Sequence, residues 1–387
     1  MAEPDGRTLG DEEVAAAERV IRSGMLSSVW GTEARALERE IAAMYGARHA
    51  ISCSSGTAAL HLAVVAAEPD PEDEIITTPI TDFGTVAPIL AQNAVPVFAD
   101  VDPSNGNLDP ASVAKLITPR TRAIMAVHLF GAPADVAALR ALADEHGLTL
   151  VEDCAQAWLT ELPGGALAGT AGHVGTLSLQ QWKHITCGDG GLTITDDDRR
   201  AHLMRMFADK GWDRAKGRSH ESLGLNYRMT ELQAAVARAQ LAKLPGVVTA
   251  RRRTAVQLLD ALRGLDGIVL PRAAGHAWWL FPLVLPGGGA RELAASLAAA
   301  GIPARAGYLN EPLNRAPIWD RPIYGTSRYP LSGPARACPE AERLVGETLL
   351  VIDWNEHYTE EHVRAIAAQV TASYGQVSGI DPSGVAR

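Results

Sequence analysis

The stretch TLSLQQWKHITCGDGGLTITDD, residues 176–197, combines a lysine with two strand-like segments and a glycine-rich turn. Apolar and polar residues alternate at 176–179 and again at 192–195, which is typical of strands. Lys183 lies between the two segments. A lysine is a nucleophile only when its amine is deprotonated and held in place, as it could be inside such a hairpin. An ordinary hairpin with one solvated lysine has the same pattern, so the stretch alone leaves both interpretations open.

Size and composition narrow the class of protein. A chain of 387 residues is long enough for one large domain and a smaller one. The formal net charge of −10 argues against a nucleic-acid binder, and the cluster Arg251–Arg253 is interpreted as a solvated helix face. No apolar run reaches the roughly 18 residues of a membrane span, the acidic start is unlike a signal peptide, and the four cysteines lack metal-type spacing. We therefore expect a cytoplasmic protein with no metal site that binds neither nucleic acid nor membranes.

Strand and helix patterns alternate from residue 49 to residue 152. This β-α repetition predicts a mostly parallel sheet with helices on both faces, which is an α/β fold of three α/β/α layers. Strand patterns at 278–285 and 302–304, with a helix pattern between them, predict a smaller C-terminal α/β domain. The expected division is an N-terminal segment at 1–30, a large domain at 31–246, a small domain at 247–375 and a tail at 376–387.

Helical periodicity is clear in two further regions. The segment Asp11–Ser23 is expected to be a helix that buries one apolar side. The residues on that side are Val14, Ala17, Val20 and Ile21. Thr230 and Gln233 form a capping-box pattern, which predicts a helix to about Lys243, and a second long helix is expected at 247–262.

Ligands of a parallel sheet bind at the carboxyl ends of its strands, and several candidate residues follow predicted strands. Ser55-Gly56-Thr57 could present backbone amides to a phosphate, or could be an ordinary helix cap. Asp153 ends an apolar strand and needs a cationic or N–H partner, which a pyridinium nitrogen or a structural salt bridge would provide. Phe83 could stack on a flat heterocycle or pack in the core.

Taken together, these residues place an anion cradle, an aromatic ring, a carboxylate and a lysine on one sheet edge. Pyridoxal 5′-phosphate (PLP) needs this set of partners. A nucleotide site fits less well, because the chain has neither a G-x-G-x-x-G motif after the first strand nor a G-x-x-x-x-G-K-[ST] motif.

At this point the chain resembles the DegT/DnrJ/StrS aminotransferases, which are sugar and cyclitol aminotransferases of PLP fold type I. The resemblance runs from Gly24 to about Tyr374. The segments that carry it are SGTAALHL at 55–62, TPITDF at 78–83, VEDCAQA at 151–157, SLQQWKHITCGDGG at 178–191 and GLNYRMTELQAA at 224–235.

The resemblance implies a role for each matching residue. Lys183 corresponds to the lysine that carries the cofactor as a Schiff base and shuttles the proton during transamination. Asp153 corresponds to the partner of the pyridine nitrogen, Gln156 to a residue near the ring hydroxyl, and Phe83 to the ring-stacking aromatic. The implied phosphate ligands are Gly56, Thr57, Ser178 and, from the other subunit, Asn226. A homodimer with shared active sites is therefore expected.

The lysine motif departs from the commoner family pattern. The family's commoner motif has an aromatic residue and a His before the lysine, whereas this chain has Gln180 and Trp182 there. Ser178, Gln180 and Lys183 form an S-x-Q-x-x-K arrangement, which resembles the branch of glutamine-dependent scyllo-inosose aminotransferases and aminohydroxybenzoate synthases. Asp189 stands where the family usually has Glu. The lysine motif favours a cyclic polyol ketone as amino acceptor, with L-glutamine or L-glutamate as donor. The resemblance as a whole implies transfer to a keto-cyclitol or a nucleotide-linked keto-sugar, in natural-product biosynthesis. A dehydratase or aromatising synthase on the same scaffold, and a PLP-binding regulatory protein without turnover, are the alternatives.

Substrate contacts are expected from segments that resemble the family's substrate pocket, including the N-terminal segment. Polar and aromatic side chains there suit hydroxylated rings, although packing at domain or subunit interfaces would use the same residues. The candidates are Trp30, Gln180, His184, Tyr308 and His357.

Overall fold

The computed structural model describes residues 7–217, 219–327 and 337–378. Its main feature is a seven-stranded sheet with the strand order β1-β7-β6-β5-β4-β2-β3. Strand β7 runs antiparallel to both of its neighbours, and the remaining pairs are parallel. The strands are β1 His49–Cys53, β2 Glu74–Thr77, β3 Val95–Phe98, β4 Thr121–Val127, β5 Thr149–Asp153, β6 Val174–Ser178 and β7 Gly191–Thr195. The mostly parallel sheet predicted from the β-α repetition is confirmed.

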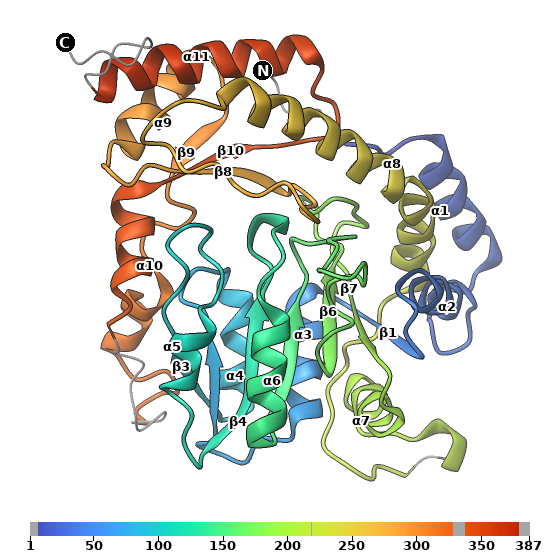
Figure 1. The fold of residues 1–387 in the computed structure, drawn as a ribbon. Coiled ribbons are helices and arrows are strands. Elements are labelled where there is room, and N and C mark those ends of the chain that lie inside the picture. Colours follow the sequence, from blue (N-terminus) through green and yellow to red (C-terminus); the bar gives the residue numbers. More distant parts are fainter. Residues whose placement is uncertain (1–6, 218, 328–336, 379–387) are drawn as a thin grey trace.

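Helices cover both faces of this sheet, because adjacent residues of its buried strands point to opposite sides. Ile75 and Val151 belong to the core beneath α3 and α7, whereas Ile76 and Leu150 belong to the core beneath α5 and α6. Figure 1 shows these layers in the lower part of the molecule. The helices are α3 Gly56–Ala67, α4 Ala87–Ala91, α5 Pro110–Ala114, α6 Val136–His146 and α7 Asp198–Ala208. The three-layer α/β/α prediction is therefore confirmed.

A second, antiparallel sheet with the order β8-β10-β9 lies beyond the carboxyl ends of the large sheet (Figure 1). It packs against α9 and α11 in a separate core that includes Phe281, Leu293 and Ile366. Its strands are β8 Leu280–Val284, β9 Ala304–Ala306 and β10 Leu349–Asp353, and its helices are α9 Ala290–Ala299, α10 Pro339–Arg343 and α11 Glu360–Ser378. A π-helical turn, Leu344–Thr348, joins α10 to β10.

A single helix, α8 (Glu231–Leu262), connects the two sheets. The prediction of two helices separated near residue 246 is wrong, since the helix runs through Pro245 and Gly246 without ending. Thr230 and Gln233 form the expected capping box at its start. The proposed domain boundary at 246/247 thus falls inside α8, and the division into domains stays an expectation. The predicted tail at 376–387 begins inside α11, and its residues 379–387 lie outside the described part of the chain.

The N-terminal helix α1 (Asp11–Ser23) has the predicted bounds but not the predicted buried side. Val14 and Ile21 are 65% and 62% exposed, while Glu13 and Ala16 are buried with Val20. Helix α1 packs against α8, where Gln240 Nε2 donates to Glu13 Oε1 at 2.9 Å. The hydrogen bond from the buried Gln240 thus explains why the side of α1 that carries Glu13 faces α8. Helix α2, Glu33–Tyr45, packs against the same part of α8. None of the helices within the described ranges is long and apolar enough to cross a membrane.

Candidate active site

The two strand-like segments around Lys183 form the antiparallel pair β6 and β7, joined by residues 179–190. Backbone bonds close this connection: Leu179 N donates to Gly190 O at 2.8 Å, and Cys187 N donates to Leu179 O at 3.1 Å. Gly190 lies so close to its neighbours that a Cβ there would be 2.7 Å from Cys187 Sγ. The glycine-rich turn therefore allows the loop to fold tightly around the lysine.

Lys183 is half-buried at the carboxyl edge of the large sheet. Burial lowers the pKa of its amine below the ordinary lysine value, and the nearby Asp153 and Asp82 carboxylates oppose that shift. The Nζ atom lies 4.4 Å from the centre of the Trp279 ring. This lysine does not have the environment of a freely solvated surface residue, so the interpretation as an ordinary hairpin is not supported.

Asp153 ends β5 and is almost completely buried. Its Oδ1 accepts from Ala155 N at 3.0 Å, and its Oδ2 accepts from Thr85 Oγ1 at 2.9 Å. Burial raises the pKa of the carboxyl group, while these two donors, Lys183 and His128 hold it down. Among the described residues, no cationic side chain lies within 4.0 Å of the Asp153 carboxylate. The alternative that Asp153 forms a structural salt bridge is therefore not supported.

The segment after β1 forms the start of α3, as both readings of Ser55-Gly56-Thr57 require. Ser55 is the N-cap, since its Oγ accepts from Ala58 N at 3.0 Å. Gly56 approaches the end of β6: a Cβ on Gly56 would be 2.8 Å from both Cβ and Oγ of Ser178. Gly84 lies equally near Thr57, because a Cβ on Gly84 would be 2.8 Å from Thr57 Oγ1. Hydroxyl groups and the first amides of a 12-residue helix thus gather at one point.

Phe83 and Gln156 occupy the same edge. Phe83 is half-buried in the short turn after β2 and packs against an apolar cluster. Gln156 Oε1 accepts from Phe130 N at 2.7 Å, and its Nε2 donates to the Tyr308 hydroxyl at 3.2 Å. The Tyr308 ring meets the rings of Phe130 and Trp279 edge-on. Tyr308, a predicted substrate residue from the C-terminal half, is thus brought to the carboxyl edge of the large sheet.

The other predicted substrate residues lie in different settings. Gln180 is half-buried, and its Oε1 accepts from Trp182 N at 2.8 Å. His184 is buried, with Nε2 2.9 Å from the carbonyl oxygen of Ala277. Trp30 is 71% exposed between α1 and α2. The predicted phosphate ligand Asn226 is exposed on the loop before α8, so the single chain does not bring it into the group around Lys183.

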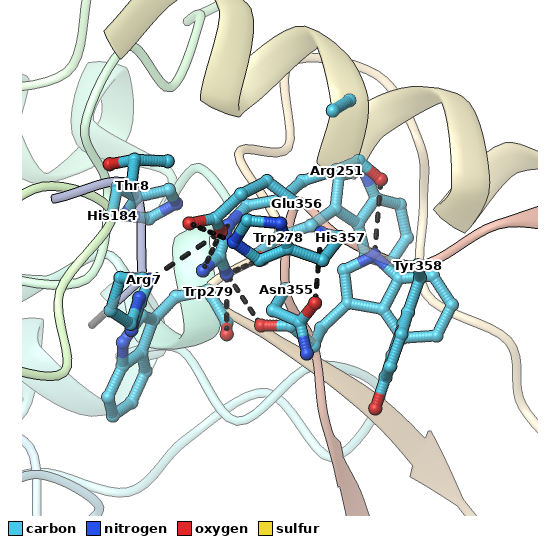
Figure 2. A network of polar contacts seen from close by, with 12 residues as sticks. Arg7, Thr8, His184, Arg251, Trp278, Trp279, Asn355, Glu356, His357 and Tyr358 are labelled. Atoms are coloured by element: carbon cyan, nitrogen blue, oxygen red, sulfur yellow. Dashed lines mark hydrogen bonds and ion pairs between the residues drawn. The ribbon is translucent and has the colours of Figure 1, made fainter. Parts of the chain in front are cut away.

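His357 belongs to a separate polar cluster around Arg251, which Figure 2 shows. The prediction that Arg251 lies on a solvated helix face is wrong, because its side chain is only 1% exposed. Its guanidinium pairs with Glu356 at 2.8 Å, and Arg7 Nη2 lies 3.6 Å from the same carboxylate. His357 is 43% exposed, with Nε2 3.8 Å from Glu356 Oε1. A buried carboxylate and three backbone carbonyls explain why this arginine faces inward.

Three potential metal ligands, His128, Glu152 and Cys154, lie within 4.8 Å of one another. His128 Nε2 is 2.9 Å from Glu152 Oε2, and Ala134 N donates to the other ring nitrogen at 3.1 Å. The Glu152 carboxylate also accepts from the backbone N–H groups of residues 169 and 172 at 2.9 and 2.5 Å. Their ligand atoms are therefore occupied, and the group ties the 169–172 loop to β5.

Comparison with known proteins identifies the family. The sequence matches the DegT/DnrJ/EryC1/StrS aminotransferase family over residues 7–371. The chain belongs to this family. Its members are PLP-dependent aminotransferases, so the protein is a PLP-dependent transaminase.

Three solved structures show how similar the chain is to individual proteins. DesV from S. venezuelae is 35% identical over 93% of each chain, with a TM-score of 0.83. A 3-amino-5-hydroxybenzoic acid synthase is 28% identical over 97% of this chain and 99% of that one, with a TM-score of 0.86. DesI, solved with its TDP-sugar product, is 28% identical over 95% of this chain and 90% of that one, with a TM-score of 0.80.

Some residues at the site were not found from the sequence. Thr85 donates to Asp153 across 68 positions of the chain, and Trp279 contacts Lys183 across 96. Thr85 follows the quoted TPITDF segment by two residues, which is a weak signal. Trp279 is the second of two adjacent tryptophans, Trp278-Trp279, and this pair is the one signal in the sequence that points to it.

Proposed function

We propose that this enzyme transfers an amino group from L-glutamate or L-glutamine to the ring ketone of a nucleotide-linked keto-sugar. The observation that supports it is that a half-buried amine, Lys183, and a buried carboxyl group, Asp153, lie at the same sheet edge, near enough to influence each other's charge but not in an ion pair. The lysine's lowered pKa favours the neutral amine that can attack a carbonyl carbon.

The residues around this pair fit PLP. Gly56, whose missing side chain leaves room beside Ser178, and the first amides of α3 suit its phosphate. Asp153, held by Thr85 and a backbone N–H, suits its pyridine nitrogen. When bound, the cofactor supplies an electron sink for the charge left when a proton leaves the donor's α-carbon.

The roles proposed for the chain's own groups follow from their chemistry. Lys183 Nζ would hold the cofactor covalently, and its amine, once free, would accept the proton from the donor's α-carbon. Asp153 would keep the pyridine nitrogen protonated, because a buried carboxylate is stabilised by a positive charge that faces it. Phe83 would stack on the ring, and Gln156, whose amide donates to the Tyr308 hydroxyl, would serve the ring hydroxyl.

The choice of acceptor rests on similarity. The 28% identity to DesI, solved in the presence of its TDP-sugar product, favours a nucleotide-linked keto-sugar. A keto-cyclitol is the second candidate, because the S-x-Q-x-x-K arrangement around Gln180 is retained and a 3-amino-5-hydroxybenzoic acid synthase is also similar. Both are hydroxylated ring ketones that belong to natural-product biosynthesis, and we propose that setting, and a cytoplasmic location, for this enzyme.

We further propose a homodimer in which each subunit completes its partner's site. Asn226 is exposed, and its neighbours Leu223 and Leu225 are 78% and 41% exposed. Exposing two leucine side chains to water is unfavourable, and a second subunit that covers this loop would remove them from water.

The shared site is tested with two variants. Lys183→Ala and Asn226→Ala should each be inactive. Mixed subunits should regain about a quarter of the wild-type rate, since half of the dimers then hold one intact site. A mixture as inactive as the parents would refute the shared site.

The amine role is tested by reductive trapping. Borohydride treatment of the PLP-loaded enzyme should label Lys183, as identified by peptide mass spectrometry. The label should be lost in Lys183→Ala and kept in Lys115→Ala, a control at an exposed lysine. A colourless protein that gives no label with added PLP would contradict the proposal.

The acceptor and the alternatives are separated by a second assay. Glutamate, glutamine and alanine are tested for conversion of the bound cofactor to its amine form. A TDP-linked keto-sugar or scyllo-inosose is then added, and the aminated product is measured. Loss of water from the acceptor without amination would favour the dehydratase or aromatising synthase, and PLP binding without any half-reaction would favour a regulatory protein.

A further inference from the structure

We infer that Trp279 is a positioning residue for the reaction: its indole face holds the free amine of Lys183 within reach of the reacting carbons while the amine carries a proton. This inference rests on the proposed function, because it assumes that Lys183 is the amine that binds PLP and moves the proton. It assigns a role to a residue from the segment that links α8 to the small sheet.

The ring and the amine are in direct contact. Lys183 Nζ lies 4.4 Å from the centre of the Trp279 ring, well inside the distance at which an ammonium group is attracted to an aromatic face. The proposed reaction requires a free lysine amine whenever the cofactor is attached to the donor instead of to the lysine. An aromatic face at this distance would hold that amine when it is protonated.

The Trp279 ring is fixed in this position from several directions. Its Nε1–H donates to the carbonyl oxygen of Trp182 at 2.7 Å, which ties the ring to the loop that carries the lysine. Its backbone N–H donates to Phe130 O at 2.8 Å. The Tyr308 ring meets it edge-on, with centres 5.9 Å apart and planes at 83°. A ring held at its edge, its indole nitrogen and its backbone cannot turn away from Lys183.

Trp278, the residue before Trp279, has a strained backbone conformation that its surroundings must hold in place. Trp278 has φ +55°, a left-handed value that is a genuine outlier for a bulky residue, and its side chain is fully buried. Its ring stacks on His276, with centres 3.9 Å apart. Strained residues of this kind concentrate at functional sites, where surrounding structure over-determines them. Here the sharp turn at Trp278 buries one indole and leaves the next one facing the lysine.

Arg251 forms the support beneath this turn (Figure 2). Its Nη1 donates to the carbonyl oxygens of Trp278 and Trp279 at 3.0 and 3.3 Å. Its Nε donates to Glu356 Oε2 at 3.0 Å, which fixes the guanidinium plane. The buried cluster of Arg251 and Glu356 thus explains how the strained turn is held, although it lies behind the ring and has no described contact with Lys183.

The chemical benefit concerns one proton. In the proposed reaction Lys183 Nζ would take a proton from the donor's α-carbon, whose bonding electron pair the bound cofactor would accept, and would later give the proton up again. Between these events the amine is positively charged. The indole face attracts the charged form, restricts its motion and keeps water from that side. Loss of the aromatic face should therefore slow proton transfer more than it weakens cofactor binding.

The test compares Trp279→Leu, which removes the aromatic face, with Trp279→Phe, which keeps a ring but loses the indole N–H. Trp319→Leu is the matched control, because this half-buried tryptophan also donates its indole N–H to a carbonyl, that of Leu313, and contacts the Phe98 ring. The three readouts are the single-turnover rate of conversion of the bound cofactor by saturating glutamate, the α-deuterium isotope effect on that rate, and the dissociation constant of PLP.

In Trp279→Leu the single-turnover rate should fall about tenfold or more, and the α-deuterium isotope effect should rise. The dissociation constant of PLP should stay within about threefold of wild type in every variant, because the ring contacts the lysine and not the phosphate site. Trp279→Phe should recover most of the rate, and Trp319→Leu should match wild type. If Trp279→Leu fails to fold, Trp279→Met fills more of the space and should show the same two changes.

Two results would overturn the inference. One is a wild-type rate and isotope effect in Trp279→Leu. The other is an equal loss in Trp279→Phe and Trp279→Leu, since the indole N–H would then be the important group. Borohydride labelling of wild-type Lys183 keeps these outcomes apart from a failure of the proposed function. A labelled lysine with a normal Trp279→Leu rate refutes only the role of Trp279, whereas an unlabelled wild-type lysine refutes the assignment on which it rests.

Discussion

Replacing Arg251 by methionine should lower the free energy of unfolding by about 3–5 kcal/mol, the usual cost of removing one partner of a buried ion pair. The side chain is 1% exposed. The substitution keeps an unbranched apolar chain in its place but removes the donors to Glu356 and to three carbonyl groups, those of Trp278, Trp279 and Trp354. The variant therefore leaves a buried carboxylate without its main cation.

Part of the unfolding free energy lost in Arg251→Met comes from the charge left on Glu356. Burial disfavours the charged form of Glu356, and Arg251 and then Arg7 outweigh it, so the pKa of this carboxyl lies below the ordinary value. In Arg251→Met, Arg7 at 3.6 Å is the remaining arginine beside this carboxylate among the described residues, and His357, at 3.8 Å, adds a positive charge only when it is protonated. The double variant Arg251→Met/Glu356→Gln removes the unpaired charge as well. It should lose at least about 1.5 kcal/mol less than the sum of the two single losses, because groups in one buried network are not additive.

The assay is urea unfolding at neutral pH, followed by both tryptophan fluorescence and circular dichroism, whose agreement tests for a single transition. Arg253→Met is the control, because that arginine is exposed on the same helix two residues away, and its loss should be within about 0.5 kcal/mol. A loss below about 1 kcal/mol in Arg251→Met, or additive losses in the cycle, would refute the reasoning.

Three further changes test other parts of the site. Gly56→Ala should weaken PLP binding about tenfold or more, measured by cofactor fluorescence, because its Cβ would lie 2.8 Å from Ser178. Asp153→Asn should reduce the half-reaction rate about 100-fold in a folded protein, measured by rapid mixing, because a neutral amide cannot stabilise a protonated pyridine nitrogen. Burial lowers the pKa of His61 to about 4, so the unfolded chain binds a proton between pH 6.5 and 4 that the folded chain does not. Stability should be complete above pH 6.5 and fall by about 1–3 kcal/mol toward pH 4, and His61→Phe should abolish that part of the pH dependence in urea unfolding.

The course of the main chain could be predicted from the sequence wherever the signal is local. Helix α1 has the predicted bounds, since acidic residues follow Gly10 and the left-handed Gly24 ends it. Alternation around Lys183 located β6 and β7 to within two residues. The chain order of strands and helices then implied a parallel sheet, and the carboxyl-edge rule gathered Gly56, Asp153 and Lys183 before any contact was known.

Predictions that depended on a partner were less successful. Val14 and Ile21 are apolar, yet they are exposed because α8 presents Gln240 and Lys243 to the polar side of α1. Two helices were expected on either side of residues 244–246, but a single helix continues through Pro245. A periodicity count ranks residues by hydrophobicity and contains no information on which neighbour a side chain will meet.

The sequence by itself determined the fold class and the family of this protein, because these follow from local periodicity and from short motifs. It also predicted the group of residues that we propose for PLP binding. Only the tertiary structure decided that Arg251 is buried, that Thr85 donates to Asp153, and that the strained turn at Trp278 brings Trp279 onto the amine of Lys183. The contact between Thr85 and Asp153 joins residues 68 positions apart, and that between Arg251 and Glu356 joins residues 105 positions apart. Their energies depend on burial and on the exact geometry of approach, which exist only after the two sheets and α8 have packed together.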